Sequence, residues 1–190
     1  MSETRWWWIR HAKVKGGAGT VVGRTDLDAD LAGIHPLPGL PDPARVIATP
    51  LKRTQQTLAA LGRKPAVIEP AFLEQDFGLW QGRRWDEIGR EADSYWADMG
   101  RARPPEGESF ADVVARVAVG LHRHGAEIPE GDVLVLAHAG SIRAALALAL
   151  DLSPAKALAL TIDNLSLTRL SRTDQGWRVE GVNLPLFPGA

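Results

Sequence analysis

The apolar run at residues 132–137 is the feature that most constrains how this chain folds. After its first residue it reads Val-Leu-Val-Leu-Ala, with no polar side chain between the apolar ones. A strand with one face in water alternates apolar and polar residues, whereas a strand covered on both faces is apolar throughout. The run therefore predicts a central strand of a sheet that has helices on both faces.

Shorter apolar segments predict the other strands, and helical patterns lie between them. Bulky or β-branched residues predict strands at 6–9, 46–48 and 66–68. The spacing of apolar residues predicts helices at 51–61, from 85 toward 96, at 109–121 and at 142–150. The alternation at 166–182 predicts a hairpin that turns at 173–176. We therefore expect a three-layer α/β/α sandwich with a mostly parallel central sheet, an antiparallel edge and a C-terminal hairpin.

Length and composition limit the classes of protein and of site. A chain of 190 residues can bury one substantial core, and we expect a single domain over residues 1–190. The chain has no cysteine, which excludes disulfides, thiolate nucleophiles and cysteine-held metals. Lys and Arg total 22 against 23 Asp and Glu, so no overall basic field attracts nucleic acid or an anionic membrane. The apolar stretches are too short for a signal peptide or a membrane span, and we expect a cytoplasmic protein.

Two of the predicted strands end in a histidine. His11 follows the first strand, with Arg10 before it, and His138 follows the central strand. Arg53 lies in the first turn of the helix after another strand. Because the carboxyl ends of parallel strands meet at one edge of a sheet, we expect these side chains to converge. Arginine grips phosphate oxygens bidentately and stays charged, so the convergence predicts a phosphate-binding pocket.

The same side chains fit the hydrolysis of a phosphate ester. Such an ester is anionic and resists attack until its oxygens are neutralised, which the arginines and a second histidine would do. A neutral imidazole can attack phosphorus if its other nitrogen is held, and His11 is the candidate nucleophile. The leaving alkoxide needs a proton, and Glu74 is the candidate acid, with Asp76 and Glu108 as alternatives.

The segments that carry these residues resemble the histidine phosphatase superfamily, which includes the phosphoglycerate mutases. The resemblance covers nearly the whole chain and rests on Ile9-Arg10-His11, residues 49–57 and His138-Ala139-Gly140. Within the superfamily, the chain is similar to the α-ribazole phosphatase branch of cobalamin synthesis. That similarity lies at residues 23–26, 73–82, 85–88 and 107–109.

The resemblance implies a role for each of these residues. His11, Glu74 and His138 would form the catalytic set, in which His11 carries the phosphoryl group and Glu74 donates the proton. Arg10 and Arg53 would bind the phosphate together with His138. The resemblance implies no metal and no cofactor, a small phosphate ester as substrate, with α-ribazole 5′-phosphate as the candidate, and inorganic phosphate as product. The segments similar to the ribazole branch add Arg24, Thr25, Trp80 and Glu108 to the expected substrate pocket.

The stretch after His11 departs from the family pattern. Ala12 replaces the usual glycine, and Lys13, Val14 and Lys15 replace the usual acidic and hydroxyl residues. A positive φ at Ala12 would cost about 1 kcal/mol, so we expect a backbone conformation that alanine adopts freely. The two lysines make one side of the pocket more basic, which leaves the identity of the substrate open.

Other motifs have weaker functional interpretations. Residues 18–25 approximate a phosphate-binding P-loop and would indicate a nucleotide-binding protein, but the flanking segments do not fit a strand and a helix. His122 and His124 diverge on a helix, so they fit a solvated face better than a metal site. The tryptophans fit core packing at residues 6–8 and the pocket rim at Trp80 and Trp85.

Alternative functions stay open on the sequence alone. A mutase needs longer lid insertions than 190 residues leave room for, and a phosphohistidine protein phosphatase needs a more open pocket. A catalytically silent sensor or scaffold for phosphorylated ligands would not need all five polar residues. An exposed edge strand or the segment around Trp96 would support a homodimer, and the sequence does not decide the oligomeric state.

Overall fold

The computed structural model describes residues 2–42 and 45–187 and has a six-stranded sheet at its centre. Its strands are β1 (Glu3–Arg10), β2 (Arg45–Ala48), β3 (Val67–Ile68), β4 (Gly131–Ala137), β5 (Ser166–Thr173) and β6 (Gly176–Pro185). They lie in the order β3-β2-β4-β1-β5-β6. The first four pair in parallel, whereas β5 pairs antiparallel with β1 and with β6. The predicted parallel sheet, antiparallel edge and C-terminal hairpin are confirmed.

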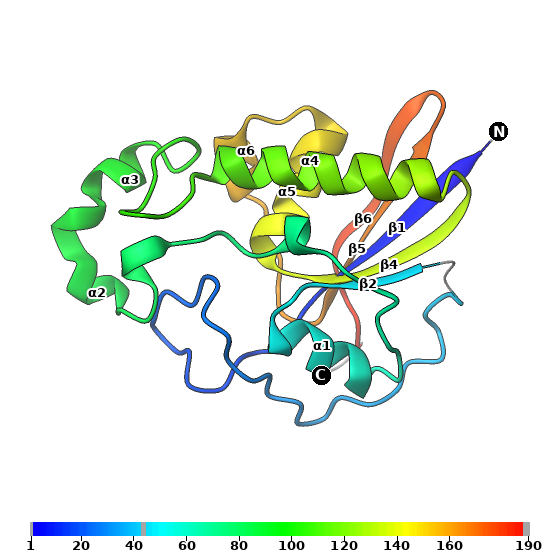
Figure 1. Ribbon diagram of the computed structural model, residues 1–190, viewed down its shortest axis with the longest axis horizontal. Helices are drawn as coiled ribbons and strands as arrows, with labels where there is room; N and C mark the ends of the chain where they lie inside the picture. Colours follow the sequence, from blue (N-terminus) through cyan, green and yellow to red (C-terminus); the bar gives the residue numbers. More distant parts are fainter. Residues whose placement is uncertain (1, 43–44, 188–190) are drawn as a thin grey trace.

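Helices cover both faces of this sheet. They are α1 (Lys52–Ala60), η1 (Pro70–Phe72), η2 (Gly78–Trp80), α2 (Trp85–Ile88), η3 (Gly89–Ala92), α3 (Asp93–Ala97), α4 (Phe110–Glu127), α5 (Ala139–Leu150) and α6 (Pro154–Leu158). Figure 1 shows α4 along one face of the sheet and α1 on the other, with α2 and α3 at one end of the molecule. In the part of the chain that is described, none of the helices combines the length and the apolar character that crossing a membrane requires.

The side chains of β4 alternate between two hydrophobic cores. Val133 and Val135 pack on the face that α4 and α5 cover. Leu134 and Leu136 pack on the opposite face, with the apolar side of α1. All four side chains have no exposed surface. This burial on both faces is the reason why residues 132–137 show no polar alternation.

A third hydrophobic cluster lies apart from these two cores. Its buried members are Val21, Trp80, Ile88, Ala92 and Tyr95, with Phe77, Trp85 and Ala102 packed against them. The rings of Trp80 and Tyr95 meet edge to face, with centroids 5.5 Å apart, a geometry that aromatic pairs favour. We call this cluster the aromatic cap.

The helix expected from residue 85 is present at Trp85 and Ile88, but it does not continue to Trp96. The helix α2 ends at Ile88, and Gly89 then has a φ of 51°, in the left-handed region that glycine adopts readily. The short segments η3 and α3 continue the chain in a new direction. The helix expected at 142–150 is confirmed, although it begins three residues earlier at Ala139.

His124 is buried, which corrects the expectation of a solvated face. Its Nε2 lies 2.8 Å from Oε2 of Glu69, and both side chains are almost fully buried. Arg123 donates to the same carboxylate oxygen at 2.9 Å, and the amide of Ala71 donates to the other oxygen at 2.9 Å. The Glu69 carboxylate thus ties α4 to the segment that leads to Glu74.

Candidate active site

The carboxyl ends of three neighbouring parallel strands bring the predicted residues together. His11 follows β1, His138 follows β4 and Thr49 follows β2. The rings of His11 and His138 have centroids 5.1 Å apart, and Arg53, in the first turn of α1, reaches the same place. The geometry that the strand ends predict is therefore present.

His11 is held with one ring nitrogen unprotonated. Its Nδ1 lies 2.6 Å from the carbonyl oxygen of Ala12, which can only accept, so Nδ1 carries the proton. Nε2 keeps its lone pair and accepts a hydrogen bond from Nε of Arg53 at 3.2 Å. Burial, together with the charges of Arg53 and Arg10, lowers the pKa of His11 to about 3. The imidazole is therefore neutral at neutral pH, as a nitrogen nucleophile must be.

Arg53 and Arg10 are desolvated cations with donors to spare. Arg53 is 1% exposed and donates to the carbonyl oxygens of Thr25 at 2.8 Å and Gly23 at 2.7 Å. Arg10 donates Nη1 to the carbonyl oxygen of Ile162 at 2.6 Å, while its buried Nε has no partner among the described residues. Burial lowers the pKa of both guanidiniums. Buried guanidiniums of this kind favour the binding of an anion that accepts hydrogen bonds from their unused N–H groups.

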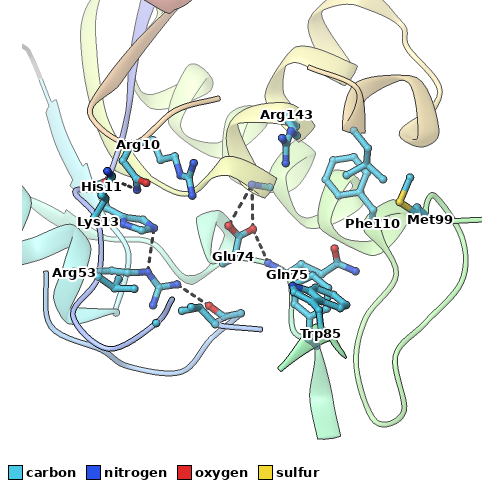
Figure 2. A pocket seen from close by; sticks show the side chains of 18 of the residues that line it. Arg10, His11, Lys13, Arg53, Glu74, Gln75, Trp85, Met99, Phe110 and Arg143 are labelled. Atoms are coloured by element: carbon cyan, nitrogen blue, oxygen red, sulfur yellow. Dashed lines mark hydrogen bonds between the residues drawn. The ribbon is translucent and has the colours of Figure 1, made fainter. Parts of the chain in front are cut away.

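The Glu74 carboxylate faces the same cavity. Its Oε1 accepts hydrogen bonds from the amides of Gly140 and Gln75, each at 3.0 Å. Gly140 lies in the first turn of α5, where free amides favour a negative charge. Figure 2 shows the carboxylate in the middle of the pocket, with Arg53 on one side and Arg143 on the other. Glu74 is therefore placed to exchange a proton with a group bound in the cavity.

His138 lies deeper than the sequence predicts. It has no exposed surface, and its Nε2 lies 2.9 Å from Oγ1 of Thr49. Burial, with the positive charge of Arg53, lowers the pKa of His138 well below its ordinary value, so this ring is neutral too. His138 packs edge to face against His11. Its contact with phosphate stays a prediction, because it does not line the cavity as it stands.

The cavity has a polar end and an apolar wall, and its volume is about 590 Å³. Figure 2 shows Trp85, Met99 and Phe110 on the side of the pocket away from His11. The polar lining consists of Arg10, His11, Lys13, Arg53, Glu74, Gln75, Arg143 and Asn164. The large apolar lining residues are Phe77, Trp85, Tyr95, Trp96, Met99, Phe110 and Leu158.

Three polar lining residues were not predicted from the sequence, namely Gln75, Arg143 and Asn164. Asn164 donates its Nδ2 to the carbonyl oxygen of His11 at 2.8 Å. Arg143 donates Nε to the carbonyl oxygen of Leu160 at 2.7 Å, and burial lowers its pKa. A signal for Arg143 was present, since it is the one charged residue of the apolar segment 142–150.

The four residues that were expected in the substrate pocket do not line this cavity, and their contact with substrate stays a prediction. Trp80 is 2% exposed because its ring belongs to the aromatic cap, beneath the wall that Trp85 forms. Thr25 contributes its carbonyl oxygen to Arg53. Arg24 and Glu108 pair with each other at 2.7 Å.

The stretch that departs from the family pattern is compatible with the site. Ala12 has a negative φ and no exposed surface, and its amide donates to Oγ1 of Thr57 at 3.0 Å. The expected alanine-compatible backbone is therefore confirmed. Lys13 lines the cavity, whereas Lys15 does not, so one of the two lysines adds positive charge to the pocket.

Solved structures share this fold. The alpha-ribazole phosphatase from Shigella flexneri superposes with a TM-score of 0.83 at 21% identity, over 94% of this chain and 96% of that one. The mycobacterial glucosyl-3-phosphoglycerate phosphatase superposes with a TM-score of 0.79 at 25% identity, over 96% of this chain and 99% of that one.

Curated relatives match at higher identity over part of their length. A bifunctional protein of Mycobacterium tuberculosis is 34% identical over 131 residues, which are 66% of this chain and 36% of that protein. Glucosyl-3-phosphoglycerate phosphatase of the same species is 30% identical over 148 residues, 70% of this chain and 66% of that protein. The model of the histidine phosphatase superfamily (branch 1) matches residues 6–185. This match covers nearly all of the sequence, and the chain therefore belongs to the histidine phosphatase superfamily, branch 1.

Proposed function

We propose that this chain is a phosphomonoesterase that hydrolyses a small phosphate ester through a phosphohistidine at Nε2 of His11. The observation that carries the proposal is the state of the His11 ring. Nδ1 is tied to the carbonyl oxygen of Ala12, and the unprotonated Nε2 points at the guanidinium of Arg53. A neutral, oriented imidazole beside two desolvated arginines fits attack on a bound phosphate.

The reaction has two steps in this proposal. Nε2 of His11 forms a bond to phosphorus while the bond from phosphorus to the ester oxygen breaks, and Glu74 gives its proton to the leaving alkoxide. Glu74 then takes a proton from water, the water oxygen bonds to phosphorus, and the phosphorus–nitrogen bond breaks. Inorganic phosphate leaves, and His11 and Glu74 return to their initial states.

The arginines neutralise the transferring group. Arg53 uses three of its five N–H donors on protein acceptors, which leaves two for phosphate oxygens. Arg10 has a buried Nε without a partner among the described residues. His138 would add a third contact to the phosphate after a small shift that exposes its buried ring to the cavity.

The apolar wall supports α-ribazole 5′-phosphate as the candidate substrate. Its leaving alcohol carries a flat heterocycle, and the aromatic rings of Trp85 and Phe110 lie at the end of the cavity away from His11 (Figure 2). Trp96 also lines the cavity. The fold that this chain shares with the Shigella enzyme is consistent with that substrate. An anionic sugar phosphate is the second candidate, because Arg143 and Lys13 add two cations to the lining and a curated relative acts on such a compound by its name.

The test uses the purified protein with EDTA present. We expect hydrolysis of 4-nitrophenyl phosphate, loss of activity in His11→Asn, and an acid-labile phosphoprotein after rapid quenching of the wild type but not of the variant. EDTA-sensitive turnover that survives His11→Asn would contradict the proposal. Tight binding of inorganic phosphate without turnover on any ester would indicate a sensor instead.

A substrate panel then tests the leaving group. It contains α-ribazole 5′-phosphate, glucosyl-3-phosphoglycerate, 3-phosphoglycerate, nucleoside monophosphates and a phosphohistidine protein. Trp85→Ala is expected to lower kcat/KM for α-ribazole 5′-phosphate and to leave 3-phosphoglycerate unchanged. A preference for glucosyl-3-phosphoglycerate that Arg143→Ala abolishes would favour the second candidate.

A further inference from the structure

Glu108 lies outside the cavity, between two arginines from different parts of the chain. Its Oε1 accepts from Nη2 of Arg24 at 2.7 Å and from Nη2 of Arg116 at 2.8 Å, and its Oε2 accepts from Nε of Arg116 at 3.1 Å. The amide of Asp76 donates to Oε1 at 2.9 Å. The three charged side chains are between 16% and 29% exposed, so water screens their attraction only in part.

Both arginines also hold the main chain of Glu74. Nε of Arg24 and Nη2 of Arg116 each donate to the carbonyl oxygen of Glu74 at 3.0 Å. Nη1 of Arg116 donates to the carbonyl oxygen of Ala71 at 2.8 Å. Glu74 lies between η1 and η2, where no helix or strand fixes the backbone, so these donors replace the hydrogen bonds of regular structure.

The same network reaches the proposed phosphate site. Arg53 donates to the carbonyl oxygens of Gly23 and Thr25, which flank Arg24 in the chain. The position of Arg24 is therefore fixed from both sides, by Arg53 through the carbonyl groups of its two neighbours and by Glu108 at its guanidinium. Two guanidiniums that meet at one carbonyl oxygen repel each other, and the Glu108 carboxylate removes that repulsion.

We propose that Arg24, Glu108 and Arg116 form a positioning clamp that sets the Glu74 carboxyl group at the distance from the phosphate site that proton donation requires. This inference rests on the proposed function, in which Glu74 protonates the leaving oxygen. None of the three clamp residues lines the cavity, so in this proposal they act through Glu74. The clamp also gives Arg24 and Glu108 a role other than the substrate contact that the sequence predicts.

A positioning role has a signature that a structural role lacks. An alkoxide is a strong base and leaves slowly without a proton, whereas 4-nitrophenolate is a weak base and leaves without one. A displaced Glu74 therefore slows transfer from an alkyl phosphate and spares transfer from 4-nitrophenyl phosphate. The parameter to compare is kcat/KM, because it reports phosphoryl transfer to His11 and not the later hydrolysis that both substrates share.

The experiment compares 2-phenylethyl phosphate with 4-nitrophenyl phosphate, two aromatic esters of similar size. Glu108→Gln is expected to lower kcat/KM for the first by roughly 10- to 100-fold and for the second by less than about 3-fold. Asp112→Asn is the matched control, since this carboxylate also lies at the start of α4 and pairs with Arg103 at 2.8 Å. The control is expected to lower the two values equally or not at all.

A double-mutant cycle separates the outcomes. In a Glu74→Gln background, Glu108→Gln is expected to cause no further loss of kcat/KM for 2-phenylethyl phosphate. The carboxyl group that the clamp would position is absent from that background. A further loss there, or an equal loss on both esters in the single variant, would overturn the clamp. If Glu108→Gln does not fold, Arg116→Lys takes its place, because it keeps the positive charge but removes the paired N–H donors. The same comparison of kcat/KM for the two esters applies to it.

The cycle also tells the two proposals apart. If Glu74→Gln itself slows both esters equally, Glu74 is not the proton donor, and the assignment under the proposed function fails together with the clamp. If Glu74→Gln is selective for the alkyl ester and Glu108→Gln is not, the clamp alone fails.

Discussion

Nε of Arg53 lies 3.2 Å from Nε2 of His11, so the guanidinium donates to the nitrogen that we propose as the nucleophile. This bond holds the imidazole and the guanidinium next to each other in the lining of the cavity. Arg53→Lys keeps a positive charge but loses the fork that reaches His11, Gly23 and Thr25 together. We expect kcat/KM for 4-nitrophenyl phosphate to fall by roughly 10²- to 10³-fold.

The neighbouring exposed residue Lys52 provides the control for this change. Lys52→Ala is expected to leave kcat/KM within about twofold of wild type, since its ammonium lies 4.0 Å from Asp26 at the surface. Full activity of Arg53→Lys would show that a point charge suffices there.

The stability of the protein is expected to fall in mild acid. The pKa of His11 is about 3 in the folded chain against an ordinary 6.5, and that of His138 is lowered in the same direction. Below 6.5 the unfolded chain therefore binds protons that the folded chain does not, and the free energy of unfolding decreases as the pH falls from 6.5 toward 3. Above 6.5 this contribution to stability is fully present.

Urea unfolding at several pH values checks this expectation. His11→Asn is expected to reduce the slope of the unfolding free energy against pH by up to about 1.4 kcal/mol per pH unit in the acid range. His122→Asn, at an exposed position on α4, controls for the loss of a histidine as such. An unchanged slope in His11→Asn would mean that His11 takes up its proton without unfolding.

Gly140→Ala is expected to displace Glu74 without unfolding the protein. A Cβ at residue 140 would lie 2.1 Å from Oε1 of Glu74, the flexible end of a side chain, so the carboxylate must move. We expect kcat/KM for an alkyl phosphate to fall roughly 10- to 100-fold. The melting temperature should stay within a few degrees, because alanine suits a helix. Gly39→Ala has no neighbour within 4 Å and is the control.

Ala12→Gly restores the glycine that is usual in the family. Because Ala12 is fully buried and has a negative φ, we expect activity within about twofold of wild type and a loss of about 1 kcal/mol in the free energy of unfolding. Activity assays check the first expectation, and urea unfolding checks the expected change in the free energy of unfolding. A large gain in activity would mean that the alanine methyl group restricts the site.

The sheet and the convergence of His11, Arg53 and His138 follow from local patterns. The run at 132–137 is apolar because both faces of β4 are covered, and the position of a residue after a parallel strand determines the edge at which it lies. These properties are encoded within a few neighbouring residues, so they could be predicted without knowledge of distant contacts.

The pocket wall and the polar networks depend on contacts between distant segments. Arg24 and Glu108 are 84 positions apart and meet only because two irregular loops pack together. His124 is buried because Glu69, from another segment, accepts its hydrogen bond. Neither contact leaves a periodic signal, which is why Arg24 and Glu108 were placed in the pocket and His124 in solvent.

The separation of the aromatic cap from the two cores that face the sheet has a consequence for how such an enzyme can diversify. Phe77, Trp85 and Tyr95, which line the apolar part of the cavity, belong to the aromatic cap, whereas Phe110 belongs to the core that packs on β1 and β4. Replacement of the cap would alter which alcohol is accepted, and the histidine and arginines at the strand ends would keep their geometry. New substrates can thus be acquired by exchange of one peripheral module, at little risk to the fold that positions the chemistry.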